Sequence, residues 1–274
     1  TAIGCTFSGN NALMGGAMFS GTAINCTFSG NNATGDGGAM YRGTAFGCTF
    51  SGNHVDCDGG AMRAGTAIGC TFSGNSATSH GDAMYYGSEY LCIFENYAAD
   101  CYGTDQLSGV SASLSVSNTI FSEEDEKRLT VYLTCEYQGE KYQIDNFNAK
   151  ISILQNGAWN DLHVLTGKSS VIDLQLGVYL ANFTVKANNS EVNLTGVKLK
   201  FTDGTTFSDL NKIINGNTAN EITLDKNYKF NETVDSEFTE GIIINRAVTI
   251  NGNGHTINAI GKSRIFHVTA SSIL

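Results

Sequence analysis

The sequence predicts an all-β fold that consists of a parallel β-helix, a β-sandwich and the capped beginning of a second β-helix. The main observation is a repeat, because TAIGCTFSGN, TAINCTFSGN, TAFGCTFSGN and TAIGCTFSGN begin at Thr1, Thr22, Thr44 and Thr66, and a decayed copy begins at Ser88. A period of 21 to 22 residues is typical of stacked coils that bury their apolar edges against one another. Composition agrees, since 32 of the 274 residues are Gly, none is Pro and only 15% are charged. We expect units at residues 1–108, 109–201 and 202–274.

Each copy alternates like a β-strand, with Ile3, Cys5 and Phe7 on one face and the residues between them on the other. We expect the first face to point inward. Coils that stack at about 4.8 Å place like residues directly over one another. The expected internal columns are Cys5, Cys26, Cys48, Cys70 and Cys92, and Phe7, Phe28, Phe50, Phe72 and Phe94.

The corner and the second strand of each coil also follow from the repeat. Ser-Gly-Asn is expected to turn the corner, because Asn tolerates left-handed backbone and its amide can bond the Asn of neighbouring coils. This turn column consists of Asn10, Asn31, Asn53 and Asn75. A second strand is expected at Gly-Gly-Ala-Met, beginning with residues 15–18, and its Met side chains should fill the core opposite the Phe column.

The pairing of Phe-x-x-Asn with Gly-Gly-Ala-Met resembles the repeat of polymorphic outer-membrane proteins and of methanogen adhesin-like proteins. The resemblance covers roughly residues 1–103 and implies a right-handed, pectin-lyase-like β-helix on a cell surface. In the fifth copy the spacing shortens by one residue and no Gly-Gly-Ala follows. We therefore expect the first solenoid to end there.

From about Val110 the repeat is replaced by short alternating strands between Gly or Asn turns, which is typical of a small antiparallel sandwich. The expected strands are 113–117, 129–137, 149–154, 170–174, 178–186 and 197–201. Leu176-Gly-Val-Tyr179 followed by Phe183-Thr-Val resembles a strand of immunoglobulin-like surface modules. That resemblance implies an immunoglobulin-like spacer.

After Thr205 we expect a short amphipathic helix through Asn215, capped by Thr206 or Ser208. Strands are expected to follow at 221–224, 241–244, 247–250, 255–258 and 265–268. A helix before such short strands predicts the cap and the first coils of a second β-helix. The Ile-rich strands near 242 and 248 again resemble adhesin-like proteins. Because the chain begins inside a repeat and ends on strand-like residues, we interpret it as a piece of a longer protein.

Charge and hydropathy exclude some partners. The net charge is −10 and no run of Lys or Arg exceeds a pair, which argues against binding to nucleic acid. No apolar stretch of 18 residues occurs, so we expect no direct membrane insertion. Sequons for N-glycosylation favour a cell-surface or extracellular location, and they lie at Asn25, Asn32, Asn182, Asn188, Asn193 and Asn231.

The eight Cys raise disulfide and metal alternatives. Stacked Cys side chains point the same way with their Cβ atoms outside the bridging range, so we expect a ladder of free thiols. Zinc requires convergent Cys or His spacing, which is absent. Cys57 and Cys101 are expected at matching loop positions two coils apart.

Loop acids raise a calcium alternative. Asp36, Asp56 and Asp58 could hold Ca²⁺, but their spacing does not match Ca²⁺-binding β-roll repeats. His80 also takes the corresponding place in the fourth copy. We therefore favour solvated turn acids and predict no metal and no cofactor.

A β-helical polysaccharide lyase or glycoside hydrolase is the main enzymatic alternative. Such enzymes place carboxylates beside Lys or Arg on neighbouring coils. Residues 1–108 contain two Arg, no Lys and no column of acids on the expected strands. We therefore predict no catalytic residues.

Two outward columns offer binding surfaces. Thr6 with Ser8, repeated in each copy, forms a hydroxyl array reminiscent of ice-binding β-helices, although β-propensity alone explains Thr at exposed strand positions. Exposed aromatic rings and Arg suit contact with glycans or proteins. The candidate ligand-binding residues are Phe19, Tyr41, Arg63 and Tyr85, with Arg42 and Tyr86 beside them. Alternatively, this column only covers a neighbouring loop.

Together these features predict a cell-surface adhesin-like protein that attaches, without catalysis, to glycans or surface proteins of another cell or of a host. The contact surface would be an extended face of the β-helix. The enzymatic alternative remains open, and so does a purely structural surface stalk.

Overall fold

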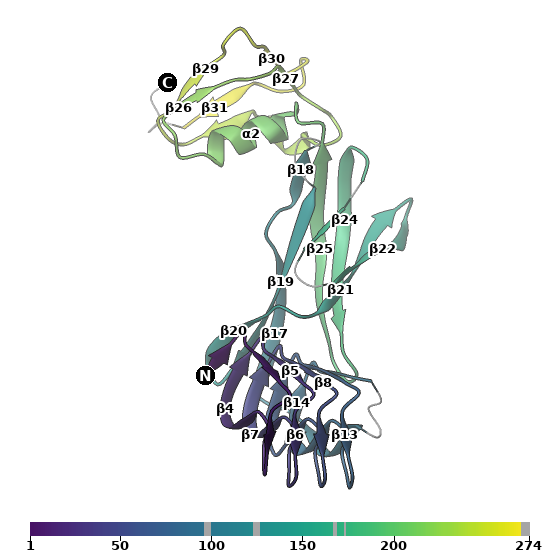
Figure 1. Ribbon diagram of the computed structural model, residues 1–274. Coiled ribbons are helices and arrows are strands. Elements are labelled where there is room, and N and C mark those ends of the chain that lie inside the picture. Colours follow the sequence, from purple (N-terminus) through teal and green to yellow (C-terminus); the bar gives the residue numbers. More distant parts are fainter. Residues whose placement is uncertain (96–99, 123–126, 167–168, 173, 270–274) are drawn as a thin grey trace.

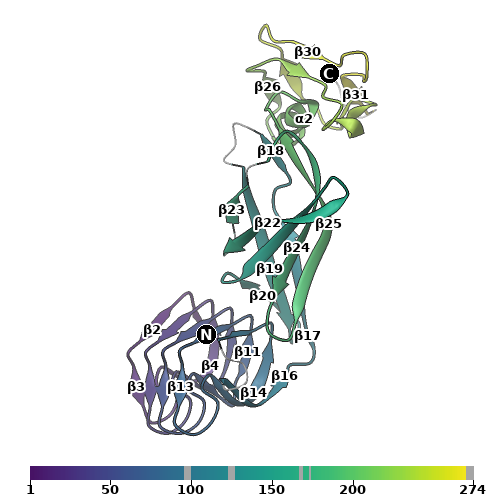
Figure 2. The same cartoon turned by 90° about the vertical axis from the view of Figure 1, so that its right-hand side faces the viewer.

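The computed structural model describes residues 1–95, 100–122, 127–166, 169–172 and 174–269. The chain is all-β, and its first unit is a parallel β-solenoid, as the repeat predicted. Figure 1 shows this solenoid at one end, two long sheets in the middle and a small unit that contains helix α2 at the other end. Figure 2 looks into the coils of the solenoid, whose strands lie on separate sides.

Three parallel sheets form the sides of the solenoid. The first contains β1 (Ala2–Ile3), β4 (Met18–Ile24), β7 (Met40–Phe46), β10 (Met62–Arg63), β11 (Thr66–Ile68), β14 (Met84–Tyr90) and β16 (Cys101–Gln106). The second contains β2 (Thr6–Ser8), β5 (Thr27–Ser29), β8 (Thr49–Ser51), β12 (Thr71–Ser73) and β15 (Ile93–Phe94). The third contains β3 (Asn11–Ala12), β6 (Asn32–Ala33), β9 (His54–Val55) and β13 (Ser76–Ala77).

The Phe column fills the centre of the solenoid. Phe28 pairs in register with Phe7 and Phe50, and successive rings from Phe7 to Phe94 stack with centroids 4.7 to 4.9 Å apart. The Met side chains at positions 40, 62 and 84 are buried in the same core. Because each ring covers the ring of the next coil, the repeated Phe fixes the register of the whole stack.

Cys side chains complete this core by bonding the backbone. The N–H of Cys26 donates to the Sγ of Cys48 at 3.4 Å, and the thiol of Cys48 donates to the carbonyl of Phe46 at 3.4 Å. Equivalent N–H to Sγ contacts join the other neighbours in the column. Cys26, Cys48, Cys70 and Cys92 are buried free thiols, whereas Cys5, on the first coil, is exposed. The Sγ atoms of Cys48, Cys70 and Cys92 therefore accept buried N–H groups that would otherwise lack a partner.

The Asn column forms a hydrogen-bonded ladder. The Oδ1 of Asn53 accepts from the N–H and the Nδ2 of Asn31, each at 2.9 Å. Its Nδ2 donates to the Oδ1 of Asn75 at 2.9 Å and to the carbonyl of Phe28 at 3.0 Å. The expected left-handed backbone at Asn was wrong, because the preceding Gly, such as Gly52 with a φ of 61°, takes that conformation. Asn is required here for its amide.

One predicted inward position was also wrong. Ile3 is exposed, and its counterparts at positions 24, 46 and 68 contact the middle unit, while Ala23, Ala45 and Ala67 are buried in the solenoid core. The residue that follows, such as Gly47 with a φ of 59°, has left-handed backbone in every copy. This extra turn interrupts the strand alternation, so that Ala and Cys both point inward and the residue after Ala points outward.

Gly-Gly-Ala-Met is a corner rather than a strand. Strand β7 begins at Met40, and the preceding Gly37 has a φ of 66°. A Cβ added at Gly38 would meet the carbonyl oxygen of Gly60 at 2.0 Å. The glycines are thus required where successive coils approach closely.

The solenoid also continues past the fifth copy. β16 pairs in parallel with β14, and Cys101 lies opposite Met84. The expected loop position of Cys101, equivalent to that of Cys57, was therefore wrong. Cys101 extends the Met column, where it is partly buried.

The middle unit consists of two sheets around one core. One contains β17 (Val110–Val116), β19 (Arg128–Tyr137), β20 (Glu140–Ile144) and β23 (Ser169–Val171). The other contains β18 (Ile120–Ser122), β21 (Asn148–Gln155), β22 (Ala158–Thr166), β24 (Gly177–Lys186) and β25 (Glu191–Thr202). The strands β18, β20 and β22 were not predicted, and β18 pairs in parallel with β25. Of the expected strand 170–174, residue 173 lies outside the described part.

The solenoid and the middle unit share a packed junction. The ring of Phe46 stacks on that of Tyr142 with centroids 3.7 Å apart. Asn25 donates from Nδ2 to the carbonyl of Gln143 at 2.9 Å and accepts the N–H of Asp145 at 3.2 Å. Because both the nitrogen and the oxygen of the Asn25 amide form hydrogen bonds to the middle unit, this sequon residue is part of the contact between the two units.

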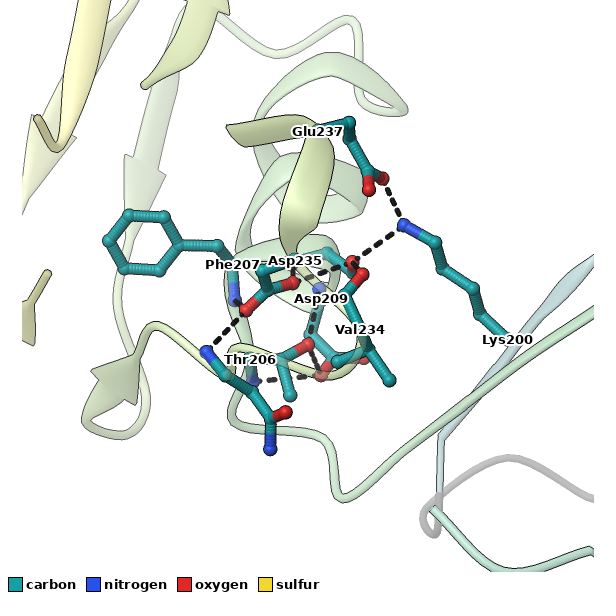
Figure 3. Close-up of polar contacts among 9 residues, drawn as sticks. Lys200, Thr206, Phe207, Asp209, Val234, Asp235 and Glu237 are labelled. Atoms are coloured by element: carbon teal, nitrogen blue, oxygen red, sulfur yellow. Dashed lines mark hydrogen bonds and ion pairs between the residues drawn. The ribbon is translucent and has the colours of Figure 1, made fainter. Parts of the chain in front are cut away.

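The last unit begins with helix α2 (Phe207–Asn215), which Thr206 caps as predicted. Asp235, fully buried, accepts from the N–H groups of Phe207 and Ser208 at 2.9 and 2.8 Å (Figure 3). Lys200 of β25 pairs with Glu237 and bonds Ser208 at 3.2 Å, which joins the helix to the middle unit. Parallel pairs follow, β26 (Glu221–Thr223) with β29 (Thr249–Asn251), β27 (Tyr228–Lys229) with β30 (Ile257–Asn258), and β28 (Ile242–Ile244) with β31 (Phe266–Val268). Strand β27 was not predicted.

Candidate functional site

The candidate ligand-binding residues lie on the outside of the first solenoid sheet, one coil apart. Phe19 of β4 pairs with Tyr41 of β7, which pairs with Arg63 of β10, and Arg63 pairs with Tyr85 of β14. Tyr102 of β16 continues the column beyond Tyr85. We call these five residues the outer ladder.

The members of the outer ladder stack on one another. The rings of Phe19 and Tyr41 lie 5.1 Å apart, and those of Tyr85 and Tyr102 lie 5.4 Å apart with planes at 12°. The guanidinium of Arg63 lies between Tyr41 and Tyr85, 5.7 and 5.5 Å from their centroids. Cation–π contacts on both sides hold Arg63 in the column.

Stacking removes much of this column from contact with a ligand. Tyr41 is only 6% exposed, whereas Phe19 at one end is 61% exposed and Tyr102 at the other is 48% exposed. Along the middle of the ladder each ring face meets its neighbour, so a ligand reaches mainly ring edges there. The accessible aromatic surface is therefore concentrated at the two ends.

Beside the outer ladder runs a second column with left-handed backbone. Ser20, Arg42, Ala64 and Tyr86 have φ values of 62°, 54°, 52° and 42°. Arg42 lies 5.2 Å from the centroid of Tyr41 and is exposed, and Tyr86 is 53% exposed. Left-handed backbone is costly for a bulky residue such as Tyr, which makes Tyr86 a position of interest.

The loop acids lie on the other side of the ladder and contact basic side chains. Asp36 contacts Arg63 at 3.2 Å, and Asp58 contacts His80 at 3.1 Å. Asp58 and His80 also form an isolated parallel bridge between coils. Among the described residues no group of three His, Cys, Asp or Glu is arranged to hold a metal ion. The carboxylates expected at turns thus take part in a polar rim along the ladder.

Ring contacts join this rim to the ladder. His80 lies 4.7 Å from the Tyr102 ring and 5.8 Å from the Tyr85 ring. Desolvation by these neighbours, and then the charge of Asp58, raise the pKa of Tyr85. Because a higher pKa favours the phenol over the phenolate, Tyr85 presents a neutral hydroxyl at ordinary pH.

The hydroxyl array of the second sheet is in register but is partly covered. Thr27 pairs with Thr49, and Ser29 with Ser51. The Nδ2 of Asn146, from the middle unit, donates to the Oγ1 of Thr49 at 2.7 Å. The middle unit therefore interrupts the flat face that an extended hydroxyl-binding surface requires.

Sequence reasoning missed Tyr102 and His80. Tyr102 lies in a coil without the repeat motif, so only the pattern Met-Tyr-Tyr-Gly before Cys-Tyr-Gly could have aligned it. His80 was noted only as an interruption of the acid positions. Its ring contacts with Tyr85 and Tyr102 could not be inferred without the coil geometry.

Comparisons with protein-family models, with curated proteins and with solved structures found no match for this chain. In the described part of the chain, no helix has the length and apolar character of a membrane span.

Proposed function

We propose that this chain belongs to a cell-surface adhesin-like protein, related to the methanogen adhesin-like family, that attaches without catalysis to glycans or surface proteins. The observation that carries the proposal is the outer ladder. Aromatic rings and Arg63 recur at one outward position in successive coils and are held by strand pairing. Such rigid aromatic surfaces lose little conformational entropy on binding.

In this proposal the other units support the ladder. The middle unit is an immunoglobulin-like spacer, which is supported by its two sheets around one core. The last unit is the capped start of a second right-handed β-helix, which is supported by the helix α2 and the parallel strand pairs after it. The stacked contact between Phe46 and Tyr142 would keep the solenoid at a fixed orientation on the spacer.

Retention of the purified protein on immobilised glycans and on intact cells tests the proposal. A variant with Phe19→Ser, Tyr86→Ser and Tyr102→Ser removes exposed rings of the outer ladder and of the column beside it. A matched control with Leu176→Ser, Val178→Ser and Ile243→Ser removes exposed apolar groups elsewhere. We expect retention to be lost in the first variant and kept in the control. Equal retention of both would refute the ladder as the binding surface, and no retention of the parent protein would favour a structural stalk.

One observation favours the enzymatic alternative. Asp36 and Asp58 lie on neighbouring coils, and each contacts a basic side chain of the next coil, Arg63 and His80 respectively. Glycoside hydrolysis uses two carboxylates. The same incubation with soluble polysaccharides distinguishes the two functions, since shortened products that disappear in an Asp58→Asn variant would overturn non-catalytic attachment.

A further inference from the structure

Tyr86 has a geometry that the other residues of the outer ladder and of the column beside it lack. Its ring lies against the backbone of Gly103, because a Cβ added at Gly103 would meet Cε1 and Cδ1 of Tyr86 at 2.6 and 2.7 Å. Gly103, with a φ of 60°, thus leaves the space in which the Tyr86 ring rests on the next coil. A ring that covers the backbone with one face and is 53% exposed offers its other face to a ligand.

The neighbours of Tyr86 fix this ring. Its plane is at 71° to Tyr85, with centroids 4.5 Å apart, and at 84° to Tyr102, with centroids 6.3 Å apart. Edge contacts with two rings restrain the ring of Tyr86 without covering it. The left-handed backbone of Tyr86, with a φ of 42°, is shared by Ser20, Arg42 and Ala64 at the equivalent position of the other coils, so it is a feature of the repeat.

Hydrogen-bonding groups lie against the two rings, Tyr85 and Tyr102, that border this platform. His80 contacts the Tyr102 ring, its side chain is 51% exposed, and it pairs with Asp58 at 3.1 Å. The hydroxyls of Tyr85 and Tyr102 belong to the same cluster. Donors and acceptors beside an open ring face match a pyranose, whose C–H face is apolar and whose edge carries hydroxyls.

The charges of the side chains near Tyr86 favour a neutral glycan over an acidic one. Asp58 is matched by His80, and Asp36 by Arg63, so the pairs around the platform have no surplus of cations. A chain with a net charge of −10 repels acidic polysaccharides unless cations are clustered. An open ring face without surplus positive charge fits a neutral glycan chain better than an anionic ligand.

We propose that Tyr86, resting on Gly103 and bordered by Tyr85 and Tyr102, is a stacking platform for a neutral pyranose of a glycan chain. This inference rests on the proposed function and names its ligand class. Phe19, at the opposite end of the ladder, is then not required for glycan affinity.

Titration with cellohexaose, mannohexaose and oligogalacturonate, followed by calorimetry on the full chain, tests the platform. We expect the protein to bind at least one neutral oligosaccharide. Tyr86→Ala should weaken that binding by about tenfold, and the control Ile243→Ala, at an exposed apolar residue outside the solenoid, should leave it unchanged. Gly103→Ala should also weaken it, because the added Cβ displaces the Tyr86 ring. In the Tyr86→Ala background, Gly103→Ala should have no further effect, and this non-additivity separates ring displacement from local misfolding.

Other outcomes would overturn the inference. Binding of oligogalacturonate alone would reject the neutral class. Retention on a surface protein without affinity for either neutral oligosaccharide would reject a glycan ligand but leave attachment intact. Neutral-glycan binding that is lost in Phe19→Ala and kept in Tyr86→Ala would place the site at the other end, and the proposed function would still hold. Only the failure of the parent protein to bind any glycan, cell or protein would refute both.

Discussion

Replacement of Asn53 by Ala should strongly destabilise the solenoid. The Asn53 amide makes four hydrogen bonds, to Asn31 twice, to Phe28 and to Asn75. At about 1 kcal/mol net for each buried bond, the loss is about 4 kcal/mol. Ala can adopt the backbone of residue 53, because Asn53 is not among the residues with positive φ, so the cost arises from the amide.

Urea unfolding followed by far-UV circular dichroism measures this loss. The one Trp, Trp159, lies on β22, so its fluorescence reports the middle unit separately. We expect the dichroism midpoint to fall with little change in its slope. The matched control is Asn32→Ala, because Asn32 donates one exposed bond at 3.4 Å to Asn11, and it should change stability by less than about 0.5 kcal/mol. Similar effects of Asn53→Ala and Asn32→Ala would refute the buried amide ladder.

Further predictions concern thiols and ion pairs. Cys48→Ala leaves the buried N–H of Cys26 without its acceptor, so we expect the free energy of unfolding to fall by about 2 kcal/mol in the same urea assay. Cys57→Ala, which removes an exposed thiol, should have little effect. Equal effects of the two variants would contradict the thiol contacts. Burial raises the pKa of Cys135 to about 12, so iodoacetamide at pH 8 should label Cys57 and spare Cys135 in the folded protein, and rapid labelling of Cys135 would reject its burial. Hydrogen bonds from Lys150 and Ser152 lower the pKa of Asp161 in the folded protein. The Asp161 carboxylate therefore stabilises the fold at pH values above the pKa of the unfolded carboxyl, and this stabilisation is lost as the pH falls through the folded pKa. Lys150→Met should flatten this acid-side change in an unfolding series from pH 6 to pH 2, and an unchanged profile would exclude the pair as its cause.

The repeat determined much of the solenoid in advance. Phe28 and Phe50 differ by one period, and stacking like residues is the simplest way for coils to bury them, so the Phe, Cys and Asn columns could be predicted from spacing alone. The helix α2 was equally predictable, since Thr206 is followed by Asp209 at the capping-box spacing. In both cases local chemistry and the tertiary fold require the same residues.

Other features depend on backbone conformation that residue types do not specify. Left-handed backbone recurs at Gly4, Asn25, Gly47, Gly69 and Leu91. Gly and Asn favour this conformation, but their presence alone did not specify the inversion that turns Phe46 outward, and Leu91 adopts it without such a preference. That inversion creates the apolar strip on which Tyr142 packs. Similarly, β16 has no repeat motif, and its alignment on β14 follows only from continued strand pairing.

The site was predicted in part. The outward position of Phe19, Arg63 and Tyr85 followed from their place after each Met, but their mutual stacking did not. It is stacking that buries Tyr41 and leaves the open surface to Tyr86 and the ladder ends.

Tyrosine ring resonances provide the most direct test of the proposed binding surface. In a sample with selectively labelled Tyr, addition of a neutral hexasaccharide that the protein binds should shift the signals of the exposed Tyr86 and Tyr102. The signals of Tyr41 and Tyr228, which are buried, should stay in place. Shifts confined to tyrosines outside the solenoid, with Tyr86 and Tyr102 unaffected, would contradict a binding surface on the outer ladder.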